Sequence, residues 1–168
     1  MKPLREPRQW QVSAAAGLFS RSEVVAHLST HTEPALSFHV DATLPGPLLD
    51  FGVYFREVTL RSSESGGTAV LVTAGGVVKY ERRIGRGWLA RAGLLVGVHD
   101  LSTDTIDDAI GLDLGGTLEA VMRASQHVRL RYAVQGTSMV VGHARNRIDV
   151  TFQPTVATTL GVEYAFRP

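Results

Sequence analysis

Two groups of residues have the side-chain types that nucleophilic catalysis requires. His99 lies close to Asp100 and Ser102, and His143 follows Ser138 by five positions. A serine activated by a histidine, with a carboxylate that orients the imidazole, can attack an ester or amide bond. An enzyme that modifies lipid would need such a set near the lipid surface. Neither group matches a catalytic signature, and loop histidines are usually solvated, so we predict no catalytic residues.

Two other groups have the residue types of metal ligands. Their members are the aspartates Asp100, Asp104, Asp107 and Asp108, and the histidines His27 and His31. The aspartates lack the regular spacing of a calcium-binding loop. The histidines are spaced to share one face of a helix, but no third ligand accompanies them. We therefore predict no metal site and no cofactor. Cysteine is absent, which excludes thiol catalysis, disulfides and thiolate-bound metal.

Charged side chains also recur within otherwise apolar stretches, on the face opposite to the apolar residues. These residues are Arg56, Lys79, Glu81, Arg91, Asp113, Glu119, Arg129, Arg131 and Glu163. A lone charge is costly to bury, so on an enclosed face they should pair with one another. We predict an interior charge network of Arg91, Asp113, Glu119, Arg129, Arg131 and Glu163. Its expected role is to fill the interior, and the alternative is a gated narrow pore.

The elements that position these residues are eight stretches in which apolar and polar residues alternate, the period of a β-strand. They cover roughly residues 8–19, 35–44, 48–60, 68–82, 88–99, 109–123, 127–136 and 148–166. Several exceed the roughly 5–6 residues of soluble strands and reach the 9–11 that cross a membrane. The connections alternate between long and short. This pattern predicts one domain over residues 1–168, an eight-stranded antiparallel up-and-down transmembrane β-barrel.

Three local signals predict irregularities. The apolar positions change face near Arg56-Glu57, which indicates a β-bulge. Pro154 would interrupt a paired strand, so a start after Pro154 is the alternative to the range 148–166 for the last strand. The first long connection, residues 20–34, contains an apolar segment that could form a short helix capped by Ser22. We expect this segment to fold back on the barrel rim, and the alternative is an exposed partner site.

Composition narrows the class further. Hydrophobic residues make up 44% of the chain, charged residues 20%, and the net charge is +1. No apolar run is long enough for a transmembrane helix, and no basic stripe predicts nucleic-acid binding. The polar face is rich in Gly, Ala, Ser and Thr, which suits the narrow interior of an eight-stranded barrel. A soluble, lipocalin-like ligand-binding barrel is the alternative. It would instead enclose Leu94, Leu112, Val134 and Val162, which face lipid in a membrane barrel.

Aromatic residues give an independent indication of a membrane boundary. Trp10, Tyr80, Trp88, Tyr164 and Phe166 share the apolar face and fall at the strand ends nearest the two termini. We predict that they form an aromatic girdle at the periplasmic interface. The predicted girdle at the outer interface is poorer. Its candidates are Phe19, Phe38 and Phe55.

Two segments resemble the small outer-membrane barrels of Gram-negative bacteria, of the OmpA or OmpX type. Residues 109–136 resemble the family's Gly-rich strand, short turn and Arg-rich returning strand. Residues 160–166, Leu-Gly-Val-Glu-Tyr-Ala-Phe, are similar to the C-terminal signal read by the barrel assembly machinery, although Arg167-Pro168 then departs from the pattern. The resemblance implies a bacterial outer-membrane location, with membrane lipid and the assembly machinery as partners. Residues 1–8 lack the apolar segment of a signal peptide. Either the chain stays inside the cell, or this is a mature form with an added start Met, and the barrel pattern favours the second.

The expected function is that of a non-enzymatic outer-membrane barrel. It would serve as an envelope structural protein, a surface-contact protein or a subunit of a larger assembly, with a protein partner at the outer loops. The alternatives are a narrow pore, a lipid-modifying barrel enzyme and the soluble ligand-binding barrel.

Overall fold

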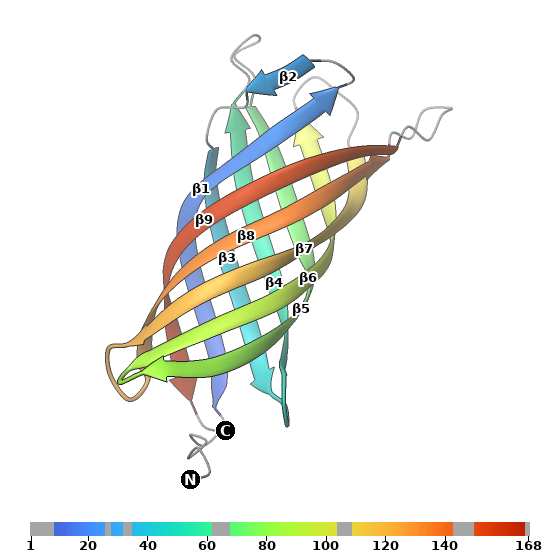
Figure 1. The fold of residues 1–168 in the computed structure, drawn as a ribbon. Helices are drawn as coiled ribbons and strands as arrows, with labels where there is room; N and C mark the ends of the chain where they lie inside the picture. The colour runs from blue at the N-terminus through green and yellow to red at the C-terminus, as the bar shows by residue number, and fades with distance from the viewer. Residues whose placement is uncertain are drawn as a thin grey trace.

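The computed structural model describes residues 9–25, 28–31, 35–61, 68–103, 109–142 and 150–166, and all its regular elements are β-strands (Figure 1). The strands are β1 (Trp10–Val25), β2 (Leu28–His31), β3 (Ala35–Pro45), β4 (Asp50–Arg61), β5 (Thr68–Gly85), β6 (Trp88–Thr103), β7 (Ala109–Arg123), β8 (Val128–Gly142) and β9 (Val150–Phe166). In the described residues, no helix is long and apolar enough to cross a membrane.

The strands close into an antiparallel barrel. Each strand from β3 to β9 pairs with its neighbour in sequence, and β1 pairs with both β3 and β9. The closing ladder runs from Trp10, opposite Phe166, to Arg21, opposite Thr155. A closed ring leaves no unpaired strand edge, and closure is what a sheet needs in a solvent that offers no hydrogen bonds. The predicted eight-stranded, up-and-down antiparallel barrel is confirmed.

The barrel is apolar outside and polar inside, the reverse of a soluble protein. Arg56 and Arg131 are each 1% exposed, whereas Leu94 on the outer face is 69% exposed. The outer face carries a continuous apolar surface of this kind on every barrel strand, which lipid would cover. The soluble alternative is wrong, because Leu94, Leu112, Val134 and Val162 all point outward.

The barrel is longer than predicted at the end opposite the termini. Segments expected in the long connections belong to strands: β1 extends to Val25, β6 to Thr103 and β8 to Gly142. The predicted short helix after Ser22 is wrong. The chain there forms a hairpin of β1 with β2, in which Ser22 lies opposite His31. Its backbone groups thus find partners in a ladder instead of a helix.

The predicted bulge and the alternative start of the last strand are also wrong. The pairing of β4 with β3 and β5 passes through Arg56 and Glu57 without a shift, so there is no bulge. The apolar side chains change face there because Val58 points into an apolar part of the interior. Strand β9 continues through Pro154, which lies opposite Ser138.

Glycines on the inner face make room for a large side chain. A Cβ added at Gly75 would lie 2.9 Å from the ring of Tyr54 and still closer to backbone atoms. A Cβ added at Gly97 would lie 2.5 Å from the Tyr54 hydroxyl oxygen. Tyr54 is 3% exposed and packs with Val77 and Leu95. The inner glycines of β5 and β6 therefore let an aromatic ring lie across the interior.

We predict that an arginine on the outer face costs stability according to its depth. Leu94→Arg, well inside β6, should lower the free energy of unfolding by about 2–4 kcal/mol in lipid vesicles, whereas Ile84→Arg near the strand end should cost about 0–1 kcal/mol. Both native side chains are strongly exposed, at 69% and 63%. Urea unfolding in vesicles measures both values. Equal, small costs would contradict a membrane-embedded outer face.

Candidate functional site

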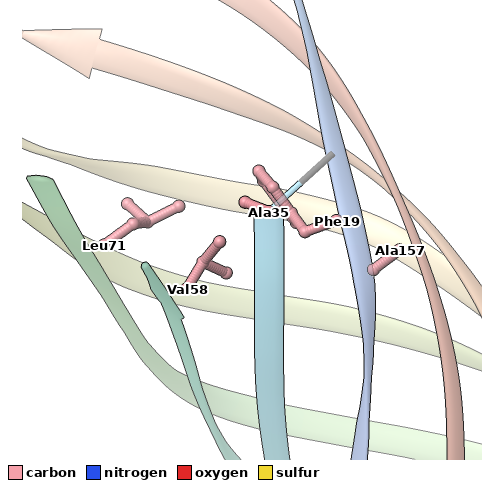
Figure 2. Close-up of a cluster of buried hydrophobic side chains, with 5 residues drawn as sticks. All are labelled: Phe19, Ala35, Val58, Leu71 and Ala157. Atoms are coloured by element: carbon pink, nitrogen blue, oxygen red, sulfur yellow. The ribbon is translucent and has the colours of Figure 1, made fainter. Parts of the chain in front are cut away.

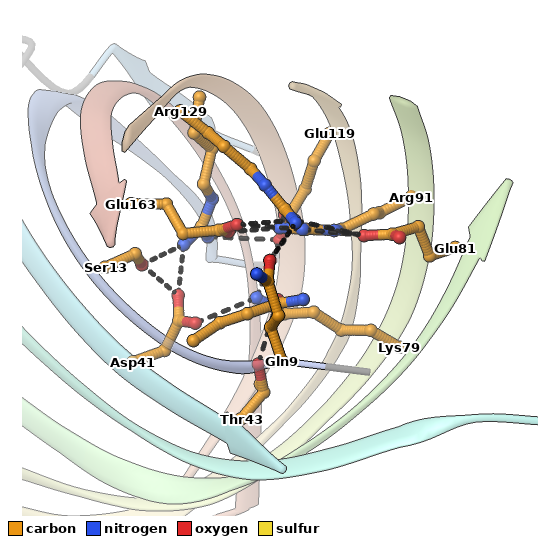
Figure 3. Close-up of polar contacts among 12 residues, drawn as sticks. Gln9, Ser13, Asp41, Thr43, Lys79, Glu81, Arg91, Glu119, Arg129 and Glu163 are labelled. Atoms are coloured by element: carbon orange, nitrogen blue, oxygen red, sulfur yellow. Dashed lines mark hydrogen bonds and ion pairs between the residues drawn. The ribbon is translucent and has the colours of Figure 1, made fainter. Parts of the chain in front are cut away.

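The interior contains a network of ion pairs, and Asp41 of β3 forms one centre of it (Figure 3). Its carboxylate accepts a hydrogen bond from the Ser13 hydroxyl at 2.8 Å and one from the Lys79 ammonium at 3.0 Å. It also pairs with the Arg131 guanidinium, and His39 Nε2 lies 3.1 Å away. A buried carboxylate with several donors is satisfied without water. Asp41 thereby ties β1, β3, β5 and β8 together.

Glu119 of β7 links this centre to the next. Its carboxylate lies 3.1 Å from Lys79 Nζ, 3.1 Å from Arg131 and 3.6 Å from Arg91. The Arg91 guanidinium of β6 in turn pairs with both oxygens of Glu163 on β9. These contacts bring together side chains from strands on opposite sides of the ring.

The network ends near the barrel rim closest to the termini. Arg129 donates to Glu163 at 3.1 Å and to the side-chain oxygen of Gln9 at 3.1 Å. Glu81 is the more accessible acid, and Arg91 donates to it at 2.7 Å. Figure 3 shows the labelled side chains of this network, here named the ionic layer, pointing toward one another across the interior.

The predicted network differs from the observed one in its membership. Arg91, Glu119, Arg129, Arg131 and Glu163 lie together in the layer just described. The sixth predicted member, Asp113, instead forms a separate pair with Arg56 at 2.6 Å.

Asp41 and Lys79 were absent from the predicted set. The alternation of the strand containing Asp41 places its side chain inside, which was the available signal. That it meets Arg131, 90 positions away, follows only from the register and stagger of the closed ring.

The ion-paired charges of the interior are balanced. Apart from His39, the interior ion pairs of the described residues join five bases and five acids: Arg56, Lys79, Arg91, Arg129 and Arg131, with Asp41, Glu81, Asp113, Glu119 and Glu163. Balance matters because an unpaired ion in a low-dielectric space costs several kcal/mol. The charge network and the Arg56–Asp113 pair are each neutral.

Apolar side chains fill the interior beyond Arg56, toward the end opposite the termini. Phe19, Ala35, Val58, Leu71 and Ala157 come from five strands and are buried (Figure 2). The Arg56 guanidinium lies 5.5 Å from the centre of the Phe19 ring, so the cation packs directly on this cluster. From the termini inward, the interior thus passes from a neutral ionic layer to an apolar one.

The candidate catalytic group of His99, Asp100 and Ser102 does not assemble. His99 points into the barrel and is 2% exposed, whereas Asp100 and Ser102 point outward from the same strand. A β-strand places adjacent side chains on opposite faces, so His99 cannot act with Asp100. Ser138 is half-buried on β8, and its proposed partner His143 lies outside the described residues.

Most of the residues considered as metal ligands lie outside the described part of the chain. Asp104, Asp107 and Asp108 lie outside the described residues, as do His27 and the side chain of His31. Within the described part of the chain, no group of three or more metal-ligating side chains occurs.

The aromatic residues predicted for the girdle lie near the barrel end that carries the termini (Figure 1). Trp10, Tyr80, Trp88 and Tyr164 are 40–52% exposed, and Phe166 is half-buried. The ring centres of Trp10 and Phe166 are 6.2 Å apart, and those of Tyr164 and Phe166 are 6.1 Å apart.

Of the three candidates for the other girdle, Phe38 and Phe55 are exposed on the outer face. Phe19 is buried inside, in the apolar cluster, and its assignment to the girdle is wrong.

Comparison with solved structures finds barrels of the same architecture. Neisserial surface protein A superposes with a TM-score of 0.75 at 17% identity, over 96% of this chain and 100% of that one. Ail, the attachment invasion locus protein of Yersinia pestis, in complex with the heparin analogue sucrose octasulfate, gives 0.64 at 10% identity, over 96% and 100%. A major outer membrane protein from Thermus thermophilus gives 0.59 at 14% identity, again over 96% and 100%.

No protein-family model matches the chain, and no curated protein does. The structural likeness confirms, at the level of the fold, the resemblance to small outer-membrane barrels. At these identities it shows the fold alone.

We predict that breaking the ionic layer strongly destabilises the barrel. Arg131→Met leaves Asp41 and Glu119 without one of their cations, so the free energy of unfolding should fall by about 3–5 kcal/mol. Arg86→Met makes the same chemical change at an exposed position in the turn between β5 and β6 and should alter it by less than about 0.5 kcal/mol. Denaturant titration of the refolded variants measures the difference. Indistinguishable midpoints would mean that the ionic layer contributes nothing.

Proposed function

We propose that this chain is a non-enzymatic β-barrel of a bacterial outer membrane, with a closed interior. Its role would be that of an envelope structural protein, a surface-contact protein or a subunit of a larger assembly. The outward apolar face and the aromatic residues near one end support the membrane location. The outer-membrane proteins among its structural neighbours support the type of membrane.

The end that carries the termini is proposed to face the periplasm. The turns β3–β4, β5–β6 and β7–β8 lie at that end and are short, whereas the other end carries the longer connections (Figure 1). Short periplasmic turns and longer outer loops are typical of outer-membrane barrels. In this orientation the connections after β4, β6 and β8 face outward and offer the surface for a partner.

The closed interior is the observation that carries the proposal. A diffusing solute would have to pass the layer of Asp41, Glu119 and Arg131 and then the apolar cluster around Phe19. Ion pairs that span strands of the whole ring do not separate without losing several kcal/mol. These two layers argue for structural filling over a conducting pore.

The position of His99 supports a non-enzymatic role. A nucleophile needs its base within hydrogen-bond reach, and among the described residues His99 faces away from Asp100 and Ser102. His99 also lies inside the barrel, away from any lipid substrate.

Surface contact is one form of the proposed role. The names of two structural neighbours, a surface protein and an attachment invasion locus protein, describe roles of that kind for those proteins. For this chain, the proposed partners are outer-membrane lipid, a protein at the outer connections and, for insertion, the barrel assembly machinery. The last is proposed from the C-terminal segment ending at Phe166.

Conductance in a planar lipid bilayer tests the closed interior. We expect the refolded barrel to give no steady ohmic current, because two layers of side chains fill its interior. Insertion must be shown in the same preparation by a gel band whose mobility changes on boiling and that forms only in detergent or lipid. A steady current from correctly folded barrel would establish the pore alternative. Folded, monodisperse protein in plain buffer, without detergent or lipid, would contradict the proposed membrane location.

Release of fatty acid from lipid tests the absence of an enzyme. Folded barrel in vesicles that contain phospholipid and lipopolysaccharide should release no more fatty acid than vesicles alone. His99→Ala should leave this background unchanged. Release that depends on the folded barrel would make the chain a lipid-modifying enzyme, and retention of that release in the His99 variant would direct the search to His143.

A further inference from the structure

Exposed basic side chains gather at one place on the barrel. Among the residues whose side chains are described, the exposed arginines and lysines are Arg82, Arg83, Arg86 and Arg123. Arg82 and Arg83 lie near the end of β5, Arg86 lies in the turn between β5 and β6, and Arg123 ends the neighbouring β7. Among the same residues, the exposed carboxylate is Asp100, near the opposite end of the barrel. The rim that carries the termini is therefore strongly basic at this point, although the chain as a whole is nearly neutral.

The two turns that supply these arginines are joined. The backbone N–H of Arg123 donates to the carbonyl oxygen of Gly87 at 2.7 Å, and Trp88 lies opposite Met122 in the ladder. A small surface pocket lies between the turns, and its lining consists of Arg83, Gly87, Trp88, Leu89 and Arg123. Arg83 and Arg123 lie opposite the inward-facing Leu89 and Arg129 in their ladders, so they belong to the inner side of the rim.

Arg82 extends the basic patch onto the lipid-facing side. Along β5 it falls between Tyr80 and Ile84, which are 52% and 63% exposed on the outer face. Its neighbour across the ladder is Ala90, two positions from Trp88, so the side chain opposite is small. A cation among lipid-facing residues is tolerated only near the interface, where the head groups lie.

We infer that Arg82 and Arg86, with Trp88, form a binding site for the phosphodiester head group of an anionic phospholipid. Arginine recognises phosphate oxygens through paired N–H donors. A lipid fits better than a free phosphate or an acidic protein, because the arginines adjoin the exposed Tyr80, Ile84 and Trp88, against which acyl chains can pack. The inference rests on the proposed membrane location. To that location it adds the class of the bound lipid, an anionic phospholipid, and it assigns this lipid to the leaflet at the barrel end that carries the termini.

Fluorescence quenching of Trp88 tests the site directly. The chain has two tryptophans, so Trp10→Phe leaves Trp88 as the single reporter. The barrel is refolded into phosphatidylcholine vesicles that contain an equal mole fraction of brominated phosphatidylglycerol or of brominated phosphatidylcholine. We expect the anionic lipid to quench Trp88 more strongly, and high salt to reduce the difference.

A matched pair of variants assigns the effect to these arginines. In Arg82→Gln/Arg86→Gln, the preference for the anionic lipid should fall at least about fivefold, the effect of about one arginine near a membrane surface. Arg145→Gln/Arg147→Gln, in the connection between β8 and β9, makes the same change in net charge and should keep the preference. Inorganic phosphate in the buffer should not displace the lipid, and displacement would overturn the choice of a lipid over a free anion.

The experiment distinguishes a failure of the proposed head-group site from a failure of the proposed membrane location. If the parent folds in vesicles, as judged by heat-modified gel mobility, but both brominated lipids quench Trp88 equally, the head-group site is overturned and the membrane location stands. An equal loss of preference in the two arginine pairs would also overturn the site, because net charge alone would then explain it. If the parent does not fold in lipid at all, the membrane location fails first.

Discussion

The ladder between β1 and β9 is the contact on which the rest of the structure depends. It closes the sheet from Trp10 opposite Phe166 to Arg21 opposite Thr155, so that no strand of the closed ring keeps an open edge along this ladder. In a hydrocarbon solvent an open edge would leave a row of unsatisfied N–H and C=O groups. Closure also creates the enclosed interior. Every other feature of the molecule follows from the need to fill that space and to cover the outside with apolar residues.

Filling a narrow interior with charges requires neutrality within each layer. Asp41, Glu119 and Glu163 are surrounded by cations from other strands, and Asp113 is matched by Arg56. Beyond the ion pairs lies the apolar cluster that contains Phe19. The Arg56 guanidinium packs on the Phe19 ring at the boundary between the ionic and the apolar part of the interior. The interior is thus a packed core made largely of polar groups. That type of core suits a scaffold that presents its ends to other molecules better than it suits a conduit.

The two ends of the barrel differ in their chemistry. The end with the termini combines aromatic rings, tight turns and a group of exposed arginines. The other end extends the strands beyond the predicted membrane span, with a β1–β2 hairpin standing on the rim. Such a polarity is what a protein needs if one end meets a phospholipid leaflet and the other meets partners outside. The proposed function and the proposed head-group site both arise from this asymmetry.

Much of the fold was readable from the sequence because a transmembrane strand must alternate strictly. Alternation identified eight strands, and it placed Arg91, Arg131 and Glu163 inside and Leu94 outside. The alternation gave a wrong result where the interior changes from polar to apolar. Val58 points into an apolar cluster, so an apolar residue occupies the inward face, and the sequence pattern alone indicated a β-bulge there.

Pairing was decided only by the tertiary structure, since register and stagger determine which inward residues meet across the ring. In the structure Asp41 belongs to the charge network through its ion pair with Arg131, whereas Asp113 pairs with Arg56 outside the network. The side chains of all four residues occupy inward-facing positions of their strands. The β1–β2 hairpin likewise depends on hydrogen bonds between segments whose local sequence also suits a helix. The sequence by itself determined the faces of the strands, because that choice is local. The contacts needed the closed ring, because they join residues far apart in the chain.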